Sequence, residues 1–445
     1  MLEALNTLLW GPGTLALILG TGAWLTLRTG GFPQRNLGRA LALSLGREAR
    51  RKGRGGVSPF GSLMTALAST VGTGNIVGVA AALVSGGPGA LVWMELAAFL
   101  GLAAKFAECM LAVKYRRVRR DGTRWGGPMA VMETRLGPAG AVLGRFYALF
   151  ALLMAFAMGA MAQSGALAAT FSAAFTLPRW RVGLVTAVLA LVILLGGVRR
   201  IADAATVLVP VMALLYIGGG LAVILGNLRR LPEAVTLMLR CAVAPEAALG
   251  GALGIVTRRE ALRWGVARSV FSNEAGLGSA AITAACADTD EPVKQGLISM
   301  TGVFFDTMVI CTVTGLAICC SGTLGTADGA GRPLTGAALT LRAFETVLGP
   351  LAPWLIGVAL GLFAFTSVLG CAVQAETTAS YLLGPGAVRP CRVLYGLAVF
   401  AGAVIPMATV LQLADLANAL MAFPNLVCLL LLSGEIAGEC ERKDR

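Results

Sequence analysis

Long apolar stretches alternate with short polar ones along the whole chain, and charged residues collect between the apolar stretches. Each apolar stretch is close to the ~20 residues that an α-helix needs to cross a bilayer. A membrane β-barrel would instead show short segments of alternating polarity. The pattern predicts an all-α polytopic membrane protein. We place eleven spans at approximately 12–27, 60–83, 88–114, 144–175, 182–197, 203–226, 253–286, 296–320, 353–382, 391–408 and 411–433.

Composition supports this prediction. Of 445 residues, 57% are hydrophobic and 13% are charged, and the mean hydropathy is +0.78. Soluble domains carry about 25% charged residues. No Pro/Ser-rich linker or soluble module is visible, so residues 1–445 are expected to form one transmembrane domain surrounded by lipid. Residues 335–349 are expected to form a short helix outside the bilayer.

The net charge of +13 raises the alternative of a nucleic-acid partner. The basic residues, however, bunch between predicted spans, and stacking aromatics are not interleaved with them. Glu48 is the one acid between Arg28 and Arg54, and the loop that starts at Lys114 is similarly basic. Cytoplasmic loops carry such an excess of Lys and Arg. We therefore expect no nucleic acid, and a protein of a prokaryotic cytoplasmic membrane with its N-terminus outside and its C-terminus inside.

Segment 227–268 fits this orientation less well, because it is arginine-rich and should lie outside. Long loops obey the charge rule less strictly than short ones. Two pieces of the segment, 245–256 and 258–270, are expected to be amphipathic helices.

The run STVGTGNIVG at 69–78 places glycine, threonine and asparagine inside a predicted span. A nucleotide loop is disfavoured, because the glycines are spaced G-x-G-x-x-x-G and no βαβ unit surrounds them. Close helix packing through small residues is one remaining interpretation. The other is a discontinuous helix, whose freed backbone groups are tolerated at membrane depth only beside protein or a wet cavity. Such a break offers carbonyls to a cation and N–H groups to an anion.

A similar but weaker run of small residues and asparagine, SNEAGLGS, follows about 200 residues later at 272–279. The two runs open two candidate five-span halves, 60–226 and 253–433. Matching interruptions in two halves are the best sequence indication of a transporter's central site. Within the second run, Glu274 is either an acid of the pocket or a capping acid near the start of a half-helix.

Ionisable residues inside spans are expensive and are functional hypotheses by default. Lys105 and Glu108 are three residues apart, which favours a local ion pair. Asp306 is a candidate cation or proton site, although anchoring of another helix by hydrogen bonds is favoured. Glu95 has no obvious partner. The candidates are Glu95, Lys105, Glu108, Asp306, Glu376 and Asp415, with Glu274 in the second run.

Thr366 and Ser367 are adjacent hydroxyls that suit Na⁺, but such a pair also bonds back to its own helix. The chain has ten cysteines, no histidine and no C-x-x-C pair. A zinc site, an enzyme active site and an organic cofactor are therefore not expected.

Three motifs in the right order closely resemble the alanine/glycine:cation symporter family: residues 72–116 (GTGNIVGV…AVKYR), 271–281 (FSNEAGLGSAA) and 304–316 (FxDTxxxCTxTGL). The resemblance extends over essentially the whole chain. It implies uptake of small neutral amino acids driven by Na⁺ or H⁺. It also implies a leucine-transporter-like architecture of two inverted five-helix repeats, here preceded by one extra span.

The resemblance also implies a substrate site. Thr73, Gly74 and Asn75 would hold the carboxylate and amino groups of the amino acid. Phe271 and Ser272 would line the opposite wall. Gln163 matches a family glutamine in the fourth span.

For sodium, the resemblance implies the carbonyls of Ala68 and Val71 together with Thr366 and Ser367. Thr70 and Asn75 are candidates for a second Na⁺.

Some positions depart from the family pattern. Cys371 begins CAVQAE, where the family usually has tryptophan and aromatics before Gly-Glu. Ala160 and Gly165 stand where asparagines are usual. A cysteine in place of tryptophan enlarges a pocket, so Cys371 is assigned to the substrate site, and a substrate bulkier than alanine is hypothesised.

The sequence therefore predicts a secondary symporter that works by alternating access. A cation channel is the alternative, although no filter-like segment appears. The sequence leaves open the amino acid and its enantiomer, Na⁺ or H⁺ as coupling ion, the stoichiometry and the oligomeric state.

Overall fold

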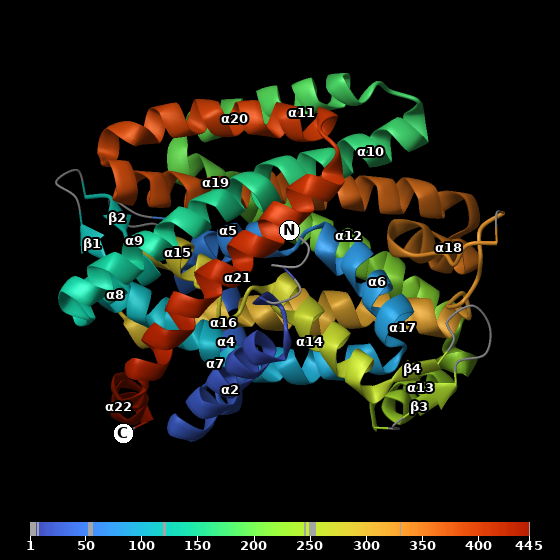
Figure 1. Ribbon diagram of the computed structural model, residues 1–445, viewed down its shortest axis with the longest axis horizontal. Helices are drawn as coiled ribbons and strands as arrows, with labels where there is room; N and C mark the ends of the chain where they lie inside the picture. The colour runs from blue at the N-terminus through green and yellow to red at the C-terminus, as the bar shows by residue number, and fades with distance from the viewer. Residues whose placement is uncertain are drawn as a thin grey trace.

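The computed structural model describes residues 6, 9–51, 57–118, 122–243, 246–248, 255–329 and 331–444, most of which are helical (Figure 1). The α-helices are α2 (Pro12–Arg28), α3 (Phe32–Arg35), α4 (Leu37–Leu45), α5 (Pro59–Thr70), α6 (Val77–Gly86), α7 (Gly89–Lys114), α8 (Pro128–Arg135), α9 (Gly137–Met154), α10 (Gln163–Phe175), α11 (Arg179–Leu194), α12 (Gly197–Gly226), α13 (Leu231–Val243), α14 (Arg258–Asn273), α15 (Ser279–Ala285), α16 (Pro292–Val303), α17 (Thr312–Ser321), α18 (Gly336–Leu348), α19 (Ala352–Leu383), α20 (Val388–Val404), α21 (Met407–Leu431) and α22 (Ser433–Asp444).

Shorter elements join or interrupt these helices. Two are π-helical, η3 (Ala155–Ala162) and η5 (Phe304–Cys311). The 3-10 turns are η1 (Arg47–Arg50), η2 (Thr73–Asn75), η4 (Leu228–Arg230), η6 (Gly349–Leu351) and η7 (Pro385–Ala387). Two antiparallel strand pairs lie in loops: β1 (Arg117–Val118) with β2 (Arg124–Trp125), and β3 (Glu246–Ala248) with β4 (Ile255–Thr257).

Seven helical segments of the described chain are long and apolar enough to cross a membrane, and one bent pair of helices makes an eighth. All eight coincide with predicted spans. The other three predicted spans coincide with shorter helices, namely α2, α11 and the α14–α15 pair. The membrane class is therefore confirmed, and the count of eleven stays a prediction.

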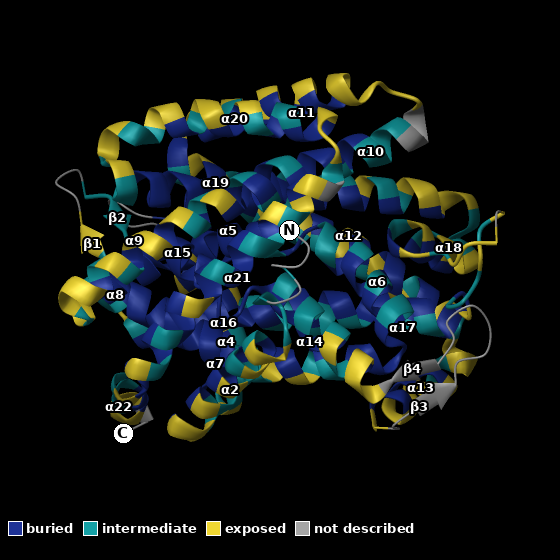
Figure 2. Cartoon of the chain, in the orientation of Figure 1, coloured by how far each residue is buried: buried dark blue, intermediate teal, exposed yellow. Residues whose placement is uncertain are grey.

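The surface supports a lipid environment. Helices α11 and α20 lie side by side along one edge of the molecule, and each has an exposed face (Figures 1 and 2). Most side chains on these exposed faces are large and apolar. A soluble monomer rarely exposes a contiguous apolar face of this kind. The residues concerned are Trp180, Leu184, Val185, Val188, Leu189, Val192, Val393, Leu394, Leu397 and Val404.

The interior is organised around two helices. Helix α7 packs against α14, α15 and α16, while α19 packs against α5, α10 and α12. Helix α5 also contacts α15 and α16, so it lies between the two groups. Close approach is built in at Gly370 of α19, where a Cβ would lie 2.8 Å from the Cα of Ser69. This packing brings the broken helices into the buried centre of the molecule.

The first broken helix begins at α5, where Ser58 caps the N–H of Gly61 at 3.0 Å and Pro59 takes the first helical position. The helix ends at Thr70, and Gly72 is extended. A single 3-10 turn, η2, then leads into α6, and the two halves of the helix are bent by 62°. Glycine and asparagine are poor helix formers, so the predicted discontinuity at 72–75 is confirmed.

The second broken helix ends at Asn273 and resumes at Ser279. Between them, Glu274, Gly276 and Gly278 have positive φ values of 53°, 91° and 78°. Two glycines permit this path, because they carry no Cβ. The interruption predicted at 272–279 is therefore present as well.

The helix expected over 258–270 is confirmed as part of α14, and α13 is a further helix of segment 227–268, but the prediction of a helix over 245–256 is wrong. Glu246–Ala248 and Ile255–Thr257 pair as antiparallel strands, while 244–245 and 249–254 lie outside the described residues. Glycines interrupt this piece, and glycine disfavours helix. The short helix expected at 335–349 is confirmed as α18.

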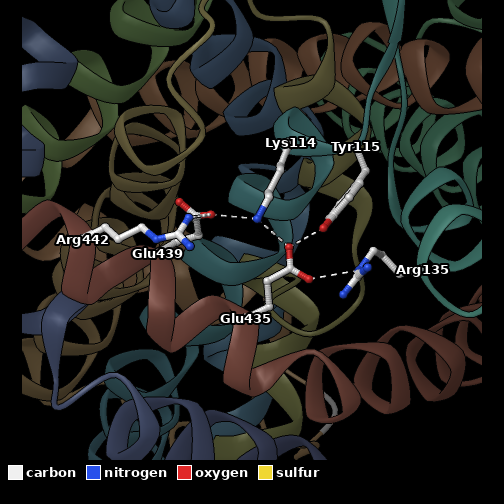
Figure 3. Close-up of polar contacts among 6 residues, drawn as sticks. All are labelled: Lys114, Tyr115, Arg135, Glu435, Glu439 and Arg442. Carbon is white, nitrogen blue, oxygen red and sulfur yellow. Dashed lines mark hydrogen bonds and ion pairs between the residues drawn. The ribbon is translucent and has the colours of Figure 1, made fainter.

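The last helix, α22, is fixed to the ends of α7 and α8 by charged side chains (Figure 3). Lys114 lies 2.6 Å from Glu435 and 2.7 Å from Glu439. Arg135 donates to Glu435 at 3.0 Å, and the hydroxyl of Tyr115 donates to the same carboxylate. These pairs are partly exposed, so each is worth little, about 0–1 kcal/mol.

Candidate functional site

The backbone of the first break is partly stabilised by its own asparagine. The Oδ1 atom of Asn75 accepts the N–H of Gly72 at 2.9 Å, which closes the turn. Thr314 donates to the carbonyl of Asn75 at 3.0 Å. Thr73 and Gly74, between them, are half-buried, and a Cβ placed on Gly74 would meet no atom within 4 Å. The turn therefore leaves a short length of accessible backbone inside an otherwise buried region.

The amide nitrogen of Asn75 ties the first break to two other helices. It donates to the carboxylate of Asp306 at 2.8 Å and to the hydroxyl of Ser272 at 3.0 Å. Ser272 in turn donates to the other carboxylate oxygen of Asp306 at 2.7 Å, and Thr307 donates to the same oxygen at 3.0 Å. All four residues are buried. We refer to Asn75, Ser272, Asp306 and Thr307 as the Asp306 network.

The network gives Asp306 the anchoring role that its position favoured. Three donors converge on one buried carboxylate, which compensates its transfer out of water. The same contacts occupy the side chains of Asn75 and Ser272. In this conformation these two residues shape the site, while the accessible groups of the first break are those of Thr73 and Gly74.

Gln163 reaches the first break from the opposite side. It is the first residue of α10, directly after the π-helical segment η3, and it is buried. The hydroxyl of Thr73 donates to its Oε1 at 3.4 Å. A Cβ on Gly72 would lie 3.5 Å from the Gln163 amide and 2.8 Å from the hydroxyl of Ser367. Gln163 and Ser367 therefore both lie against the turn, as the resemblance implied.

The predicted sodium ligands divide into two groups. Ser367 donates to the carbonyl of Val71 at 3.4 Å, so the two oxygens lie together. Ala68 is one turn earlier at the end of α5, and α19 packs directly against it. Thr366 instead faces Met212, 3.2 Å from its sulfur, and donates back to the carbonyl of Leu362.

Thr70, the candidate for a second Na⁺, is the last residue of α5 and is half-buried. Its carbonyl belongs to the last turn of a helix, where carbonyl groups have no partner within the helix. The carbonyl of Thr70 could therefore be an oxygen ligand, but none of the described contacts places another hydroxyl group beside it.

Cys371 packs beside the π-helical segment η3. It is buried with Ala160 in a cluster formed by η3, α19 and α20, where its sulfur would lie 2.8 Å from a Cβ on Gly159. Gly165 faces the carbonyl of Gly402, 2.8 Å from its own missing Cβ. The hypothesis that these positions enlarge a substrate pocket stays a prediction.

The second break is enclosed on all sides by protein. Lys105 donates to the carbonyl of Glu274 at 3.1 Å, and Glu108 accepts the N–H of Gly278 at 3.1 Å. Asn425 of α21 donates to Glu108 at 2.7 Å and to the carbonyl of Gly276 at 3.0 Å. Within the described chain, Lys105 and Glu108 form no ion pair with each other. The local ion pair expected from their spacing is wrong, because both side chains bind the broken backbone.

Two further acids predicted inside spans, Glu274 and Glu95, also have partners. The carboxylate of Glu274 accepts the hydroxyl of Ser279, the first residue of α15. It lies beside the start of the half-helix but forms no side-chain cap there, so the choice between a capping acid and an acid of the pocket stays a prediction. Glu95 accepts the hydroxyl of Thr312 at 2.8 Å, so it joins α7 to α17.

Sequence reasoning missed Lys105, Glu108 and Asn425 as elements of the second break, and it missed the π-helical segments beside Gln163 and around Asp306. Such segments are frequent at functional sites. The charged residues Lys105 and Glu108 inside a predicted span indicated that this region needed polar partners. Their spacing along one helix, however, suggested an ion pair between the two.

Comparisons with known proteins agree with this geometry. Residues 1–442 match the model of the sodium:alanine symporter family. An uncharacterised transporter of Haemophilus influenzae is 44% identical over 97% of this chain and 92% of its own length. The sodium/alanine symporter AgcS of Methanococcus maripaludis is 41% identical over 99% and 96%. The probable sodium/glutamine symporter GlnT of Bacillus subtilis is 37% identical over 96% and 87%.

Among solved structures, MhsT in complex with L-phenylalanine aligns with a TM-score of 0.61 over 85% of this chain and 90% of that chain, at 15% identity. At that identity the likeness shows the fold alone, and it supports the leucine-transporter-like architecture. The match covers the whole chain, and the relatives are transporters. The chain is therefore a membrane transporter rather than an enzyme, and it belongs to the sodium:alanine symporter family.

Proposed function

We propose that this protein carries a small neutral amino acid and Na⁺ together into the cell, and that both bind at the first break. The observation that carries this proposal is the half-buried Thr73–Gly74 backbone, which lies against Gln163 and Ser367 in a buried region. Family membership supports the same substrate class.

The amino acid is assigned to the turn η2. The N–H groups of Thr73 and Gly74 begin this turn, so they have no acceptor within it, and they suit an α-carboxylate. The hydroxyl of Thr73 and the amide of Gln163 flank the same space and provide acceptors for the ammonium group. Phe271 and Ser272 belong to the opposite wall, where Ser272 also fixes Asn75.

Na⁺ is assigned to the oxygens beside this turn: the carbonyls of Ala68 and Val71 and the hydroxyl of Ser367. Hard cations take oxygen ligands of this type. Thr366 joins this set only after its side chain rotates away from Met212 and the carbonyl of Leu362. Thr70 remains the candidate for a second ion.

Coupling follows from the shared turn. If Na⁺ orders the backbone at Val71, the neighbouring N–H groups at Thr73 and Gly74 are pre-organised for the carboxylate. By linkage, the amino acid then raises the affinity for Na⁺ by the same factor. Protons are the alternative coupling ion for this scheme.

The proposal includes two inverted repeats, 60–226 and 253–433, preceded by α2, with the N-terminus outside and the C-terminus inside. Alternating access would move one helix group against the other around the first break. Substrate size stays open, because Cys371 and Ala160 are packed in the core of the structure. A cation channel is disfavoured, because the relatives of known type are symporters.

The test is uptake into proteoliposomes with an imposed Na⁺ or H⁺ gradient. The panel comprises glycine, L-alanine, D-alanine, L-glutamine and L-leucine, and choline replaces Na⁺ in the control. We expect Na⁺-dependent accumulation of at least one small neutral amino acid. Failure of every amino acid with both gradients, or a cation conductance that ignores amino acids, would contradict the proposal.

A further inference from the structure

A cavity lies on the face of the molecule where the described N-terminal residues pack, and Phe271 is part of its lining. Its volume is about 220 Å³, and it lies between α14, α21 and the N-terminal segment. The cavity is smaller than the pockets of about 300–1,000 Å³ that hold drug-sized ligands, and its size suits one amino acid. Its lining residues are Asn6, Trp10, Arg263, Trp264, Ala267, Arg268, Phe271 and Asp415.

Arg268 and Asp415 bring opposite charges to this cavity. They attract each other, yet they form no ion pair within 4 Å. Among the described residues, neither side chain has a hydrogen-bond partner. A half-buried charge without a hydrogen-bond partner lowers the stability of the protein. A direct ion pair, or a ligand that binds both charges, would offset this loss.

Two aromatic rings pack against the Arg268 guanidinium, whose N–H groups have no acceptor among the described residues. The guanidinium carbon of Arg268 lies 5.6 Å from the ring centre of Trp264 and 5.5 Å from that of Phe271. Its side chain also passes over Gly78, where a missing Cβ would be 3.8 Å from Cδ. Arg268 therefore lies over the start of α6, directly beyond the first break.

Asp415 is fixed from the other side. Its backbone carbonyl accepts the indole N–H of Trp10 at 3.0 Å, and Asn6 donates to the carbonyl of Gln412 at 2.9 Å. The N-terminal segment thus packs on α21 beside the carboxylate. The sequence marked Asp415 as an intramembrane charge, and the proposed function leaves it without a role.

We propose that this cavity is a separate binding site for a zwitterionic amino acid, with the α-carboxylate on Arg268 and the α-ammonium on Asp415. A guanidinium suits a carboxylate through its fork of donors. Trp10, Trp264 and Phe271 provide an apolar wall for the side chain. This inference rests on the proposed function, because Phe271 lines the cavity and is also assigned to the wall of the first site, so the amino acid would reach the first break from here.

The first test reads binding in the wild-type full chain without Na⁺. Trp10 and Trp264 line the cavity, so tryptophan fluorescence reports its occupancy. The probe is L-alanine, titrated into purified protein in choline buffer. We expect a saturable signal that weakens tenfold or more in Asp415→Asn and is unchanged in Asp328→Asn. Asp328 pairs with Arg332 and does not line the cavity.

The analogue N-acetyl-L-alanine keeps the carboxylate and lacks the ammonium group. We expect it to bind at least tenfold more weakly than L-alanine to the wild type and equally weakly to Asp415→Asn. No saturable signal from L-alanine in the wild type, or equal binding of both probes, would overturn this inference.

Uptake provides a second measurement on the same variants. Asp415→Asn is expected to raise KM about tenfold and to leave kcat within about twofold, because the first break is intact. Unchanged KM in a folded Asp415→Asn protein would overturn the inference. If the wild type accumulates none of the amino-acid panel, the proposed function fails. If uptake is normal but the fluorescence signal is absent, only the second site fails.

Discussion

The two helix breaks look alike in sequence, yet their surroundings differ. The first break, residues 71–76, keeps Thr73 and Gly74 half-buried. Its backbone forms neutral hydrogen bonds with Asn75, Thr314 and Ser367, and the side chain of Asn75 also donates to the buried carboxylate of Asp306. The second break, residues 274–278, is buried throughout and is held by charged side chains of α7 and by Asn425.

The difference in partners implies a difference in function. A neutral hydrogen bond contributes about 0.5–1.5 kcal/mol net, and one to a charged group about 1.5–3. Removing one member of a buried charged network costs about 3–5 kcal/mol. At the first break the charged contact is made by the Asn75 side chain, so the backbone at Thr73 and Gly74 can rearrange around a ligand. At the second break charged side chains bind the backbone directly, so it acts as a fixed joint. Five substitutions test this contrast, from the largest expected effect to the smallest.

Asp306→Ala should have the largest effect, because it removes the carboxylate that accepts from Asn75, Ser272 and Thr307 in a buried region. The Asn75 amide retains other acceptors, so the expected effect comes from loss of the buried carboxylate at the centre of the network: a loss of about 3–5 kcal/mol in stability and no measurable uptake. Thermal unfolding in detergent and proteoliposome uptake measure the two effects. A stable Asp306→Ala protein that transports normally would show that the network does not organise the first break.

Gly278→Ala should damage the fixed joint. The residue has a φ of +78°, and a Cβ there would lie 2.9 Å from the hydroxyl of Tyr147 and closer still to Pro128. Overpacking costs about 1–3 kcal/mol and the left-handed backbone about 1–2 more. We expect a lower melting temperature and less monodisperse protein. An unchanged melting temperature would contradict the fixed-joint assignment.

Gly74→Ala is the matched substitution in the first break, where a Cβ meets open space. We expect an unchanged melting temperature, because nothing in the structure clashes. Uptake should fall about tenfold or more in kcat/KM, since a methyl group occupies the space assigned to the amino acid, and ~1.4 kcal/mol corresponds to tenfold. Wild-type uptake by Gly74→Ala would place the substrate elsewhere.

Ser367→Ala should weaken Na⁺ binding by about 5- to 30-fold, or ~1–2 kcal/mol, through loss of one oxygen beside Val71. The Na⁺ dependence of uptake measures this change. Thr366→Val is the control, because Thr366 faces Met212 and its loss should shift the Na⁺ dependence less. If Thr366→Val shifted the Na⁺ dependence more than Ser367→Ala, the Na⁺ ligand would be Thr366 rather than Ser367.

Glu435→Gln should have the smallest effect. It removes one charge from the partly exposed network that fixes α22 (Figure 3), and such pairs contribute about 0–1 kcal/mol. We expect a slight loss of stability that disappears at high salt and an uptake close to wild type. A loss of stability as large as that expected for Gly278→Ala would show that the contacts of α22 contribute more to the stability of the protein than partly exposed ion pairs do.

The sequence predicts where both helices break, because glycine and asparagine disfavour helix within a few residues. It cannot predict which break is enclosed, because that depends on partners far away in the chain. Asp306 lies 231 positions from Asn75, and Asn425 lies 317 positions from Glu108. Spacing on one helix even suggested the wrong partner for Lys105.

The sequence also did not predict the direction in which individual side chains point. Thr366 and Ser367 are equivalent in sequence, yet adjacent residues of a helix face different neighbours, and only Ser367 meets Val71. Cys371 is one turn beyond Ser367, but it packs into η3. The π-helical segments that set these directions have no recognisable pattern of polar residues.

Hydrogen–deuterium exchange of the wild-type protein tests the contrast most directly. Exchange of 69–78 and of 272–279 is measured with and without Na⁺ plus the amino acid that is transported best. We predict that Na⁺ and substrate together slow exchange at 69–78, while 272–279 exchanges slowly under both conditions. Ligand-dependent protection confined to 272–279, with 69–78 unaffected, would contradict the assignment of the first break as the binding site.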